Sequence, residues 1–144
     1  NPDVVVRVCA DNPLIDPGEI DKLVDYFKKN NFDYAANNTP DCGLPDGLGC
    51  EVVKADILLK IGKEIFDNHY REHVTNYILD HQGGYAIGCL YAEQELWYPG
   101  LKLDIDTYED LVRLQRFCSS LAEANAPYWT AKEIIFNVQK AIEI

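Results

Sequence analysis

The sequence predicts an α/β fold with a largely parallel sheet flanked by helices. Short runs of β-branched residues alternate with segments of helical periodicity along the chain, which is the pattern of strand–helix–strand units. The length of 144 residues is enough for one domain with a sizeable core. No linker, internal repeat or low-complexity tract divides the chain, so we expect residues 1–144 to form a single domain.

The first strand and the first helix are clearly marked. Val4–Cys9 is a run rich in β-branched residues and predicts a buried strand. Asp16 is a typical N-cap, Pro17 suits the first helical position, and Glu19 completes a pattern like a capping box. A helix is therefore expected from residue 17 to about residue 30. Its apolar face carries Ile20, Leu23, Val24 and Phe27.

The rest of the chain continues this alternation. Further strands are expected at Phe32–Ala36, Cys50–Lys54, Tyr85–Tyr91 and Leu101–Ile105. Further helices are expected at Ala55–Phe66 and at about Tyr70–Asp80. A helix after residue 107 is expected to have the apolar face Leu111, Leu114 and Phe117. The last helix is expected to follow the capping box of Thr130 and Glu133, with the apolar face Ile134, Ile135, Val138 and Ile142. The polar segment Asn37–Gly49 is rich in glycine and proline and predicts a long loop, and such loops in compact domains are often functional.

The composition excludes some classes of protein. Lys plus Arg is 13 and Asp plus Glu is 24, so the formal net charge is −11, which argues against a general nucleic-acid surface. A nucleotide ligand is compatible with this charge, because a bound metal ion reverses the local field. No apolar run reaches the length of a membrane span, and no secretory signal pattern opens the chain.

The cysteines are expected to be mostly reduced. They are Cys9, Cys42, Cys50, Cys89 and Cys118; their number is odd and no CxxC is present, so a zinc site has little support. Cys9, Cys89 and Cys118 are expected as small core residues. Reduced thiols favour a cytoplasmic location. The chain has no methionine, even at position 1, which favours an N-terminally truncated or processed chain.

Two aspartates provide the leading hypothesis about chemistry. Asp11 follows the strand Val4–Cys9, and Asp106 follows the expected strand Leu101–Ile105. Open α/β sheets bind ligands at the carboxyl ends of their strands, and carboxylate oxygens suit Mg²⁺, which takes further ligands from water and substrate phosphates. The alternative is that Asp11 caps a turn and Asp106 caps the next helix, since aspartate is a common capping residue.

A second group of polar residues is a candidate for substrate binding. Arg71, Glu72 and His73 stand together, and Arg is able to hold a carboxylate bidentately while His bonds a hydroxyl; the alternative is an ordinary charged helix terminus. The turn Pro45–Gly49 leads to Glu51, whose carboxylate is a candidate partner for a substrate hydroxyl; the alternative is a plain turn. The sequence has no P-loop, no GxGxxG and no serine in a nucleophile elbow.

Four segments, in this order, resemble one family. They are Val6–Asp16, Pro45–Glu51, Arg71–Thr75 and Leu103–Leu111. The chain resembles the cytidylyltransferases of the spore-coat polysaccharide biosynthesis type, which are relatives of the enzymes that activate acylneuraminate and 3-deoxy-manno-octulosonate with CTP. The resemblance covers nearly the whole chain and is most specific at Arg71–Thr75 and at Asp106–Leu111.

The resemblance implies a Rossmann-like fold of the nucleotide-diphospho-sugar transferase type. In the implied reaction a sugar hydroxyl attacks the α-phosphate of CTP and pyrophosphate leaves. Asp11 and Asp106 are then the catalytic residues that bind Mg²⁺, which agrees with the need of phosphoryl-type transfer for positioning and charge neutralisation. The residues implied in binding CTP and the sugar or sugar acid are Arg7, Asn12, Glu51, Arg71, Glu72 and His73.

One departure from the family concerns the beginning of the chain. Family members open with a strand and a loop of Arg, Ser, Gly and Lys that grips the CTP triphosphate and base, and nothing here matches it. The resemblance therefore implies a chain that lacks its N-terminal portion, is inactive alone, and exposes a sheet edge that invites pairing, for example in a homodimer. The alternatives are a non-catalytic sugar- or nucleotide-binding domain of the same fold and a structural fragment that pairs with a complementary chain.

Overall fold

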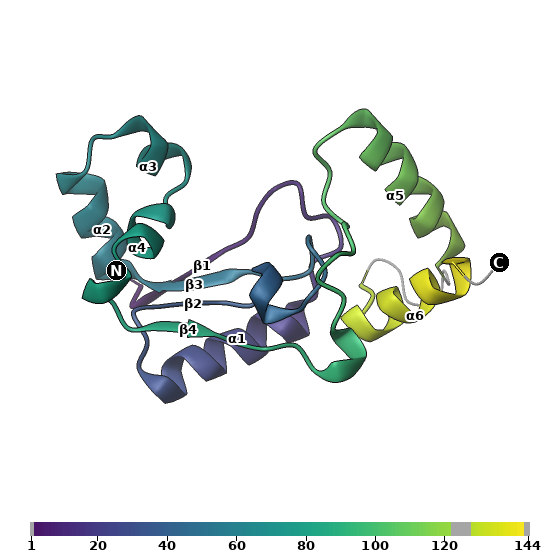
Figure 1. Cartoon of the computed structure of the whole chain (residues 1–144), viewed down its shortest axis with the longest axis horizontal. Coiled ribbons are helices and arrows are strands. Elements are labelled where there is room, and N and C mark those ends of the chain that lie inside the picture. The colour runs from purple at the N-terminus through teal and green to yellow at the C-terminus, as the bar shows by residue number, and fades with distance from the viewer. Residues whose placement is uncertain (1, 122–127, 143–144) are drawn as a thin grey trace.

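The computed structural model describes residues 2–121 and 128–142, with side chains described up to residue 138. The strands are β1 (Val4–Arg7), β2 (Tyr34–Ala36), β3 (Glu51–Lys54) and β4 (Ile87–Cys89); the helices are α1 (Pro17–Asn30), α2 (Ala55–Glu64), α3 (Asn68–Glu72), α4 (Asn76–Asp80), α5 (Tyr108–Ser120) and α6 (Ala131–Ile142); the 3-10 turns are η1 (Pro40–Cys42), η2 (Gln82–Gly84) and η3 (Gln94–Leu96). Helices pack on both faces of the sheet (Figure 1), so the α/β class is confirmed. Among the described helices, none is both long enough and apolar enough to cross a bilayer.

The sheet is mixed rather than largely parallel. Its order is β1-β3-β2-β4; β3 runs antiparallel to β1 and β2, and β2 and β4 are parallel. The register pairs Val5 with Val53, and Ala35 with both Val52 and Gly88. The difference from the sequence prediction arises between β2 and β3. That connection contains η1 and no α-helix, so the chain turns back beside β2 instead of crossing over through a helix.

The two faces of the sheet have separate apolar layers. Val52 lies on the face that α1 covers and belongs to the same cluster as Leu23. Val53 lies on the opposite face, in a cluster with Ile61 of α2 and Ile78 of α4. Both valines are completely buried. Helices on both sides therefore explain why β3 is apolar at consecutive positions instead of alternating with polar residues.

A third apolar cluster joins α5 and α6 to the loops at the other end of the sheet (Figure 1). Its buried members are Leu14, Leu44, Leu48, Leu96, Leu103, Leu114, Ala131, Ile134 and Ile135. Leu114 and Ile134 confirm the apolar faces expected for these two helices, whereas the side chain of Ile142 lies outside the described residues. The cluster fixes the position of α5 relative to the loop that precedes β3.

Asp16 caps two helices. Its Oδ1 accepts a hydrogen bond from the N–H of Gly18 at 2.7 Å, which confirms it as the N-cap of α1. Its Oδ2 accepts from the N–H of Ala131 at 2.7 Å, at the start of α6 and 115 positions away in sequence. Glu19 does not complete a capping box, because its carboxylate binds Lys22 Nζ at 2.8 Å. The buried Asp16 carboxylate therefore ties the beginnings of α1 and α6 together.

The strand expected to be buried over Val4–Cys9 is an edge strand of the described sheet instead: β1 ends at Arg7, and none of its residues is fully buried. Two further elements differ from the prediction. The helix expected over Tyr70–Asp80 is divided into α3 and α4 by a break at His73, whose φ and ψ are −107° and 76°. Thr75 then begins α4 as its N-cap, with its side chain buried. The strand expected over Leu101–Ile105 stays outside the sheet and forms a single parallel bridge with Asp46. In both cases tertiary contacts override a local pattern.

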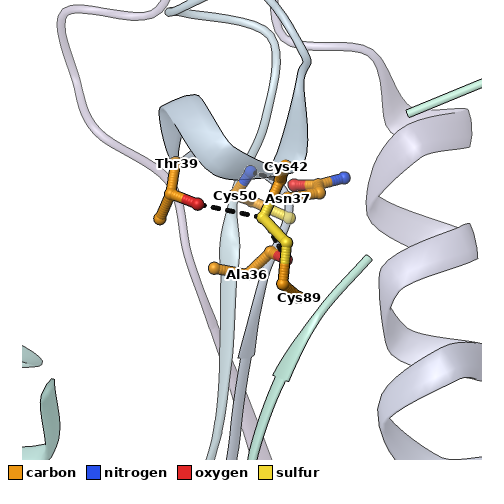
Figure 2. The surroundings of a disulfide bond; sticks show 6 residues. All are labelled: Ala36, Asn37, Thr39, Cys42, Cys50 and Cys89. Atoms are coloured by element: carbon orange, nitrogen blue, oxygen red, sulfur yellow. Dashed lines mark hydrogen bonds between the residues drawn. A yellow bond between two sulfur atoms is a disulfide. The ribbon is translucent and has the colours of Figure 1, made fainter. Parts of the chain in front are cut away.

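A disulfide joins Cys42 of η1 to Cys89 of β4 (Figure 2). The two Cα atoms are 5.9 Å apart, within the usual range for disulfides. The expectation of mostly reduced cysteines, with Cys89 as a simple core residue, is corrected for this pair. The pairing depends on the loop before β3 folding back over β4, which sequence spacing does not reveal. Cys9, Cys50 and Cys118 are free.

Candidate active site

The fold brings the segments of Asp11 and Asp106 together. The loop after β1 meets the segment before α5 where the N–H of Ile105 donates to the carbonyl of Asp11 at 3.0 Å. Both aspartate side chains are exposed. Asp106 does not cap α5; Thr107 does, in a capping box with Asp110. Asp106 therefore stands at the start of a helix, directly after the residue that bonds the Asp11 backbone, and its carboxylate does not serve as the helix cap.

Lys102 forms ion pairs with three carboxylates in and near the segment that precedes α5. Its Nζ lies 2.7 Å from Asp104 Oδ2, 2.5 Å from Asp106 Oδ2 and 3.7 Å from Asp110 Oδ2. Hydrogen bonds to Asp104 and then to Asp106 raise the pKa of Lys102, so its ammonium stays charged at neutral pH. Sequence reasoning did not single out Lys102 or Asp104. Their positions two residues apart could have indicated this pair, because alternate side chains of an extended segment lie on the same side.

The loop between η1 and β3 brings Asp46 next to the segment that contains Lys102 and Asp104. Its N–H donates to the carbonyl of Leu101 at 3.0 Å, and its carbonyl accepts from the N–H of Leu103 at 2.9 Å. Gly47 has a φ of +93°, and a Cβ there would lie 2.7 Å from backbone atoms of Leu103 and Asp104, so glycine is required for this approach. Burial, and then the charge of Asp104, raise the pKa of Asp46.

The carboxylate oxygens near Asp11 and Asp106 are donors of the kind that Mg²⁺ prefers. Among residues 2–121 and 128–142, no group of three or more His, Cys, Asp and Glu side chains is arranged to hold a metal on its own. Mg²⁺ does not require one, since it is often bound through one or two carboxylates and substrate phosphates. Asp104 Oδ1 is buried without a hydrogen-bond partner, and Asp46 and Asp104 repel each other. A cation at the Asp11 and Asp106 carboxylates therefore meets a negative local field.

Glu51 is held inside the protein by hydrogen bonds. Its Oε1 accepts from the hydroxyl of Tyr34 at 2.6 Å and from the hydroxyl of Thr75 at 3.0 Å, and its Oε2 pairs with the guanidinium of Arg7. Burial, followed by the nearby Glu51 charge, raises the pKa of Tyr34 well above its ordinary value. The structure thus gives Glu51 internal partners, instead of leaving it free for the predicted contact with a substrate hydroxyl.

The other residues predicted to bind substrate fall into two places. Asn12 follows Asp11 in the loop after β1, whereas Arg7 ends β1 and pairs with Glu51. Arg71–His73 is exposed on α3 and at its end, on the opposite side of the molecule from α5 (Figure 1). The structure does not bring Arg71–His73 into contact with the aspartates. Glu51 accepts hydrogen bonds from Arg7 at the end of β1 and from Thr75, the N-cap of α4.

Arg71 has an apolar setting. Its Nη1 donates to the carbonyl of Ile65 at 3.4 Å, and its side chain lines a pocket of about 270 Å³ together with apolar residues of α2 and with Tyr70 and Val74. The ring of His73 lies 5.4 Å from that of His69, centroid to centroid. This end of the molecule therefore offers a guanidinium and an imidazole next to an apolar surface.

Comparison with known proteins places the chain in a family. The family model described as Cytidylyltransferase matches residues 1–142. SpsF, a spore coat polysaccharide biosynthesis protein of Bacillus subtilis, is 33% identical over 135 residues, which are 93% of this chain and 54% of that protein. An uncharacterized protein of Methanocaldococcus jannaschii is 39% identical over 108 residues, which are 75% of this chain and 43% of that protein. The chain thus spans about half the length of these curated relatives.

A solved structure supports the fold. The structure of a cytidylyltransferase from Leptospira borgpetersenii superposes with a TM-score of 0.85 at 23% identity, over 98% of this chain and 58% of that chain. Its agreement concerns the path of the backbone. Since the family model covers almost every residue of the chain, including both aspartate segments that the fold brings together, the chain belongs to the cytidylyltransferase family.

Proposed function

We propose that the protein containing this chain transfers a cytidylyl group from CTP to a hydroxyl of a sugar or sugar acid and releases pyrophosphate. The observation that carries the proposal is the meeting of the Asp11 and Asp106 segments, within a chain of the cytidylyltransferase family. The bond formed joins the sugar oxygen to the α-phosphorus, and the bond broken releases pyrophosphate. The name of the Bacillus subtilis relative supports a product that serves surface polysaccharide biosynthesis.

In this proposal Asp11 and Asp106 hold a magnesium ion. Bound there, Mg²⁺ would neutralise charge on the phosphates of CTP. The Lys102 ammonium forms an ion pair with the Asp106 carboxylate, and the hydrogen bonds to Asp104 and Asp106 raise the pKa of Lys102. Arg7, which Glu51 holds in place, keeps a charged guanidinium four positions before Asp11, because the hydrogen bond to Glu51 raises the pKa of Arg7.

The sugar side is proposed at Arg71–His73. These side chains are exposed, and guanidinium and imidazole groups suit the carboxylate and hydroxyls of a sugar acid. They lie at the other end of the molecule from α5 (Figure 1). An effect of Arg71→Ala on sugar affinity, with CTP affinity unchanged, is the expected result of competition binding measurements.

The test is pyrophosphate release. Because the chain spans about half of its curated relatives, it is assayed alone and joined to the part of SpsF that the match leaves uncovered, with CTP, Mg²⁺ and a panel of sugars and sugar acids. We expect release that requires both CTP and Mg²⁺, and a loss of at least roughly 100-fold in turnover for Asp106→Asn. Asp21→Asn, an equal change on the exposed side of α1, should keep full activity.

Two outcomes oppose the proposal. A folded, joined protein that releases no pyrophosphate with any acceptor would favour the alternative of a binding domain without catalysis. Full turnover by Asp106→Asn would remove Asp106 from the metal site. Far-ultraviolet circular dichroism of each variant shows whether a loss of activity reflects a loss of fold.

A further inference from the structure

The disulfide between Cys42 and Cys89 joins parts of the chain that are separated by 47 residues. Cys42 closes the turn η1 within the loop Asn37–Gly49, and Cys89 ends β4, which lies at one edge of the described sheet (Figure 2). We propose that the two cysteines form a reversible thiol–disulfide pair, a modification site for low-molecular-weight disulfides such as oxidised glutathione, and that oxidation fixes this loop onto β4. The inference goes beyond the proposed function and does not depend on it.

The surroundings of Cys42 accommodate both oxidation states. Its Sγ lies 3.4 Å from the carbonyl oxygen of Ala36, which accepts a hydrogen bond from a thiol (Figure 2). That carbonyl also accepts from the N–H of Leu90 at 2.9 Å, so it keeps a partner when Cys42 is oxidised. The hydroxyl of Thr39, 2.9 Å from the same Sγ, is able to donate to the sulfur in either state. Reduction therefore leaves no buried polar group without a partner at this place.

The two sulfurs differ in access, which sets the order of the exchange. Cys42 is completely buried, whereas Cys89 is half-buried. The Cys89 thiolate attacks a low-molecular-weight disulfide, forms a mixed disulfide and releases one thiolate. The Cys42 thiolate then attacks Cys89 Sγ and releases the second thiolate. The protein loses two protons and two electrons in total, and the oxidant is reduced to two thiols.

The remaining cysteines are poorly suited to compete. Burial raises the pKa of the thiols of Cys9, Cys50 and Cys118, in the case of Cys50 to about 12. Exchange requires the thiolate, so a thiol with a raised pKa exchanges slowly at neutral pH. Cys50 lies in the surroundings of the disulfide (Figure 2), and its protonated state protects the pair from rearrangement. The pairing of Cys42 with Cys89 is expected to be specific, because their Cα atoms lie 5.9 Å apart, within the range that a disulfide requires.

Oxidation adds a covalent anchor to a loop that is otherwise held by backbone hydrogen bonds and by the buried side chains of Leu44 and Leu48. The N–H of Ala92 donates to the carbonyl of Cys42 at 2.7 Å, and the N–H of Tyr98 donates to the carbonyl of Gly43 at 2.8 Å. Further along, Asp46 is bonded to the segment before α5. The disulfide restrains the first part of the loop, and a cross-link over such a long span opposes local opening.

The experiment equilibrates the purified chain in glutathione buffers of increasing oxidised fraction and then alkylates it with N-ethylmaleimide in denaturant. We expect five adducts for the reduced chain and three for the oxidised chain, since Cys9, Cys50 and Cys118 stay free. Peptide mapping should place the disulfide between Cys42 and Cys89. Amide hydrogen exchange over residues 37–49 should be at least about tenfold slower in the oxidised chain, and its melting temperature should be higher by roughly 5–15 °C.

Variants separate this pair from a general effect of oxidation. Cys89→Ser should carry no disulfide in any buffer and should exchange like the reduced chain, whereas Cys118→Ser should still form the pair. If Cys89→Ser does not fold, the reduced and oxidised forms of the unaltered chain supply the same comparison. Five adducts in every buffer, a disulfide that maps to Cys50, or equal exchange over residues 37–49 in both states would each overturn the proposal.

Discussion

Glu51 shows how this fold keeps a buried charge at the scale of one residue. The residue is only 5% exposed, and an ionised carboxylate in such a place is costly unless it is paired and hydrogen-bonded. Arg7 supplies the opposite charge from β1, Tyr34 a hydroxyl from β2 and Thr75 a hydroxyl from α4. Three strands and the N-cap of α4 therefore meet at one carboxylate. No local pattern of residues along the chain indicates this meeting.

We expect Glu51→Ala to destabilise the chain by about 2–5 kcal/mol, because it leaves the buried hydroxyls of Tyr34 and Thr75 without an acceptor. Urea unfolding monitored by circular dichroism measures this free energy. Glu72→Ala, at an exposed position, is the control and should change it by less than about 0.5 kcal/mol. A loss below about 1 kcal/mol for Glu51→Ala would show that the network contributes little.

A second expectation at this scale concerns Asp106 and metal binding. Mn²⁺ is a spectroscopic substitute for Mg²⁺, and its binding to the chain in the presence of CTP is measurable by electron paramagnetic resonance. Asp11→Asn and Asp106→Asn should each weaken binding by about tenfold or more, because each removes a negative oxygen ligand. Binding by both variants as strong as that of Asp21→Asn would contradict the assignment.

At the scale of elements, the sequence predicts best what neighbouring residues decide. The starts of α1, α5 and α6 follow from caps within a few residues: Asp16 bonds Gly18, Thr107 pairs with Asp110, and Thr130 pairs with Glu133. The direction of β3, the break at His73 and the absence of Leu101–Ile105 from the sheet depend on contacts between distant segments, so local patterns could not reveal them.

The candidate site divides in the same way. Local motifs mark Asp11 and Asp106 as candidates, and the structure places their segments side by side, although Leu101–Ile105 is not a strand of the sheet as expected. The internal role of Glu51 does not, because a glutamate after a glycine-rich turn has the same appearance whether it faces a ligand or the core. Its partners Arg7 and Thr75 lie 44 and 24 positions away. Only the folded arrangement of the strands brings Arg7 and Thr75 to the two carboxylate oxygens of Glu51.

The shared cap at Asp16 makes a prediction about two helices. Asp16→Ala removes an acceptor from both Gly18 and Ala131 and should lower the free energy of unfolding by about 2–4 kcal/mol. Asp16→Asn keeps one oxygen acceptor for α1 but presents an amide group to Ala131, so it should lose an intermediate amount. Urea unfolding compares both with Asp21→Ala, an exposed change on α1. Equal losses of unfolding free energy for Asp16→Asn and Asp16→Ala would contradict separate contributions of the two carboxylate oxygens to α1 and α6.

The capping box of α5 gives a pH dependence. Partial desolvation opposes ionisation of Asp110, but the guanidinium of Arg113 and the bonds from Thr107 lower the pKa of Asp110 to about 2. The pKa in the unfolded chain is near 3.9. The ionised carboxylate therefore stabilises the fold above about pH 4, and this contribution is lost as the pH falls toward 2.

Comparison with Asp110→Asn isolates this contribution. The difference in unfolding free energy between the unaltered chain and the variant, measured in urea from pH 2 to pH 6, should be largest above pH 4 and shrink toward pH 2. A difference that does not change with pH would contradict the role of the Asp110 charge.

At the scale of the whole molecule, β1 is an open edge within the described residues. It pairs with β3 on one side, and Val6 is 38% exposed there. An edge strand with exposed valine offers unpaired backbone groups to another chain. The isolated chain is therefore expected to associate with itself as its concentration rises.

Val6→Lys should reduce this association, because a lysine on an edge strand opposes pairing with a second strand. Sedimentation velocity over a range of concentrations measures it. Gln115→Lys adds the same charge on the exposed side of α5 and should leave the association unchanged. A monomeric unaltered chain, or equal behaviour of the two variants, would show that β1 is not the contact.

The double cap at Asp16 also has a consequence for synthesis on the ribosome. Its second partner, Ala131, is 115 positions later, and translation at about 5–20 residues per second needs roughly 6–23 seconds to reach it. During that interval α1 is able to form and take its own cap, while the other carboxylate oxygen remains bonded to water. Among the described helices, α6 then docks after the others, so a nascent chain that stalls before residue 131 would expose the unpaired start of this contact to chaperones and proteases.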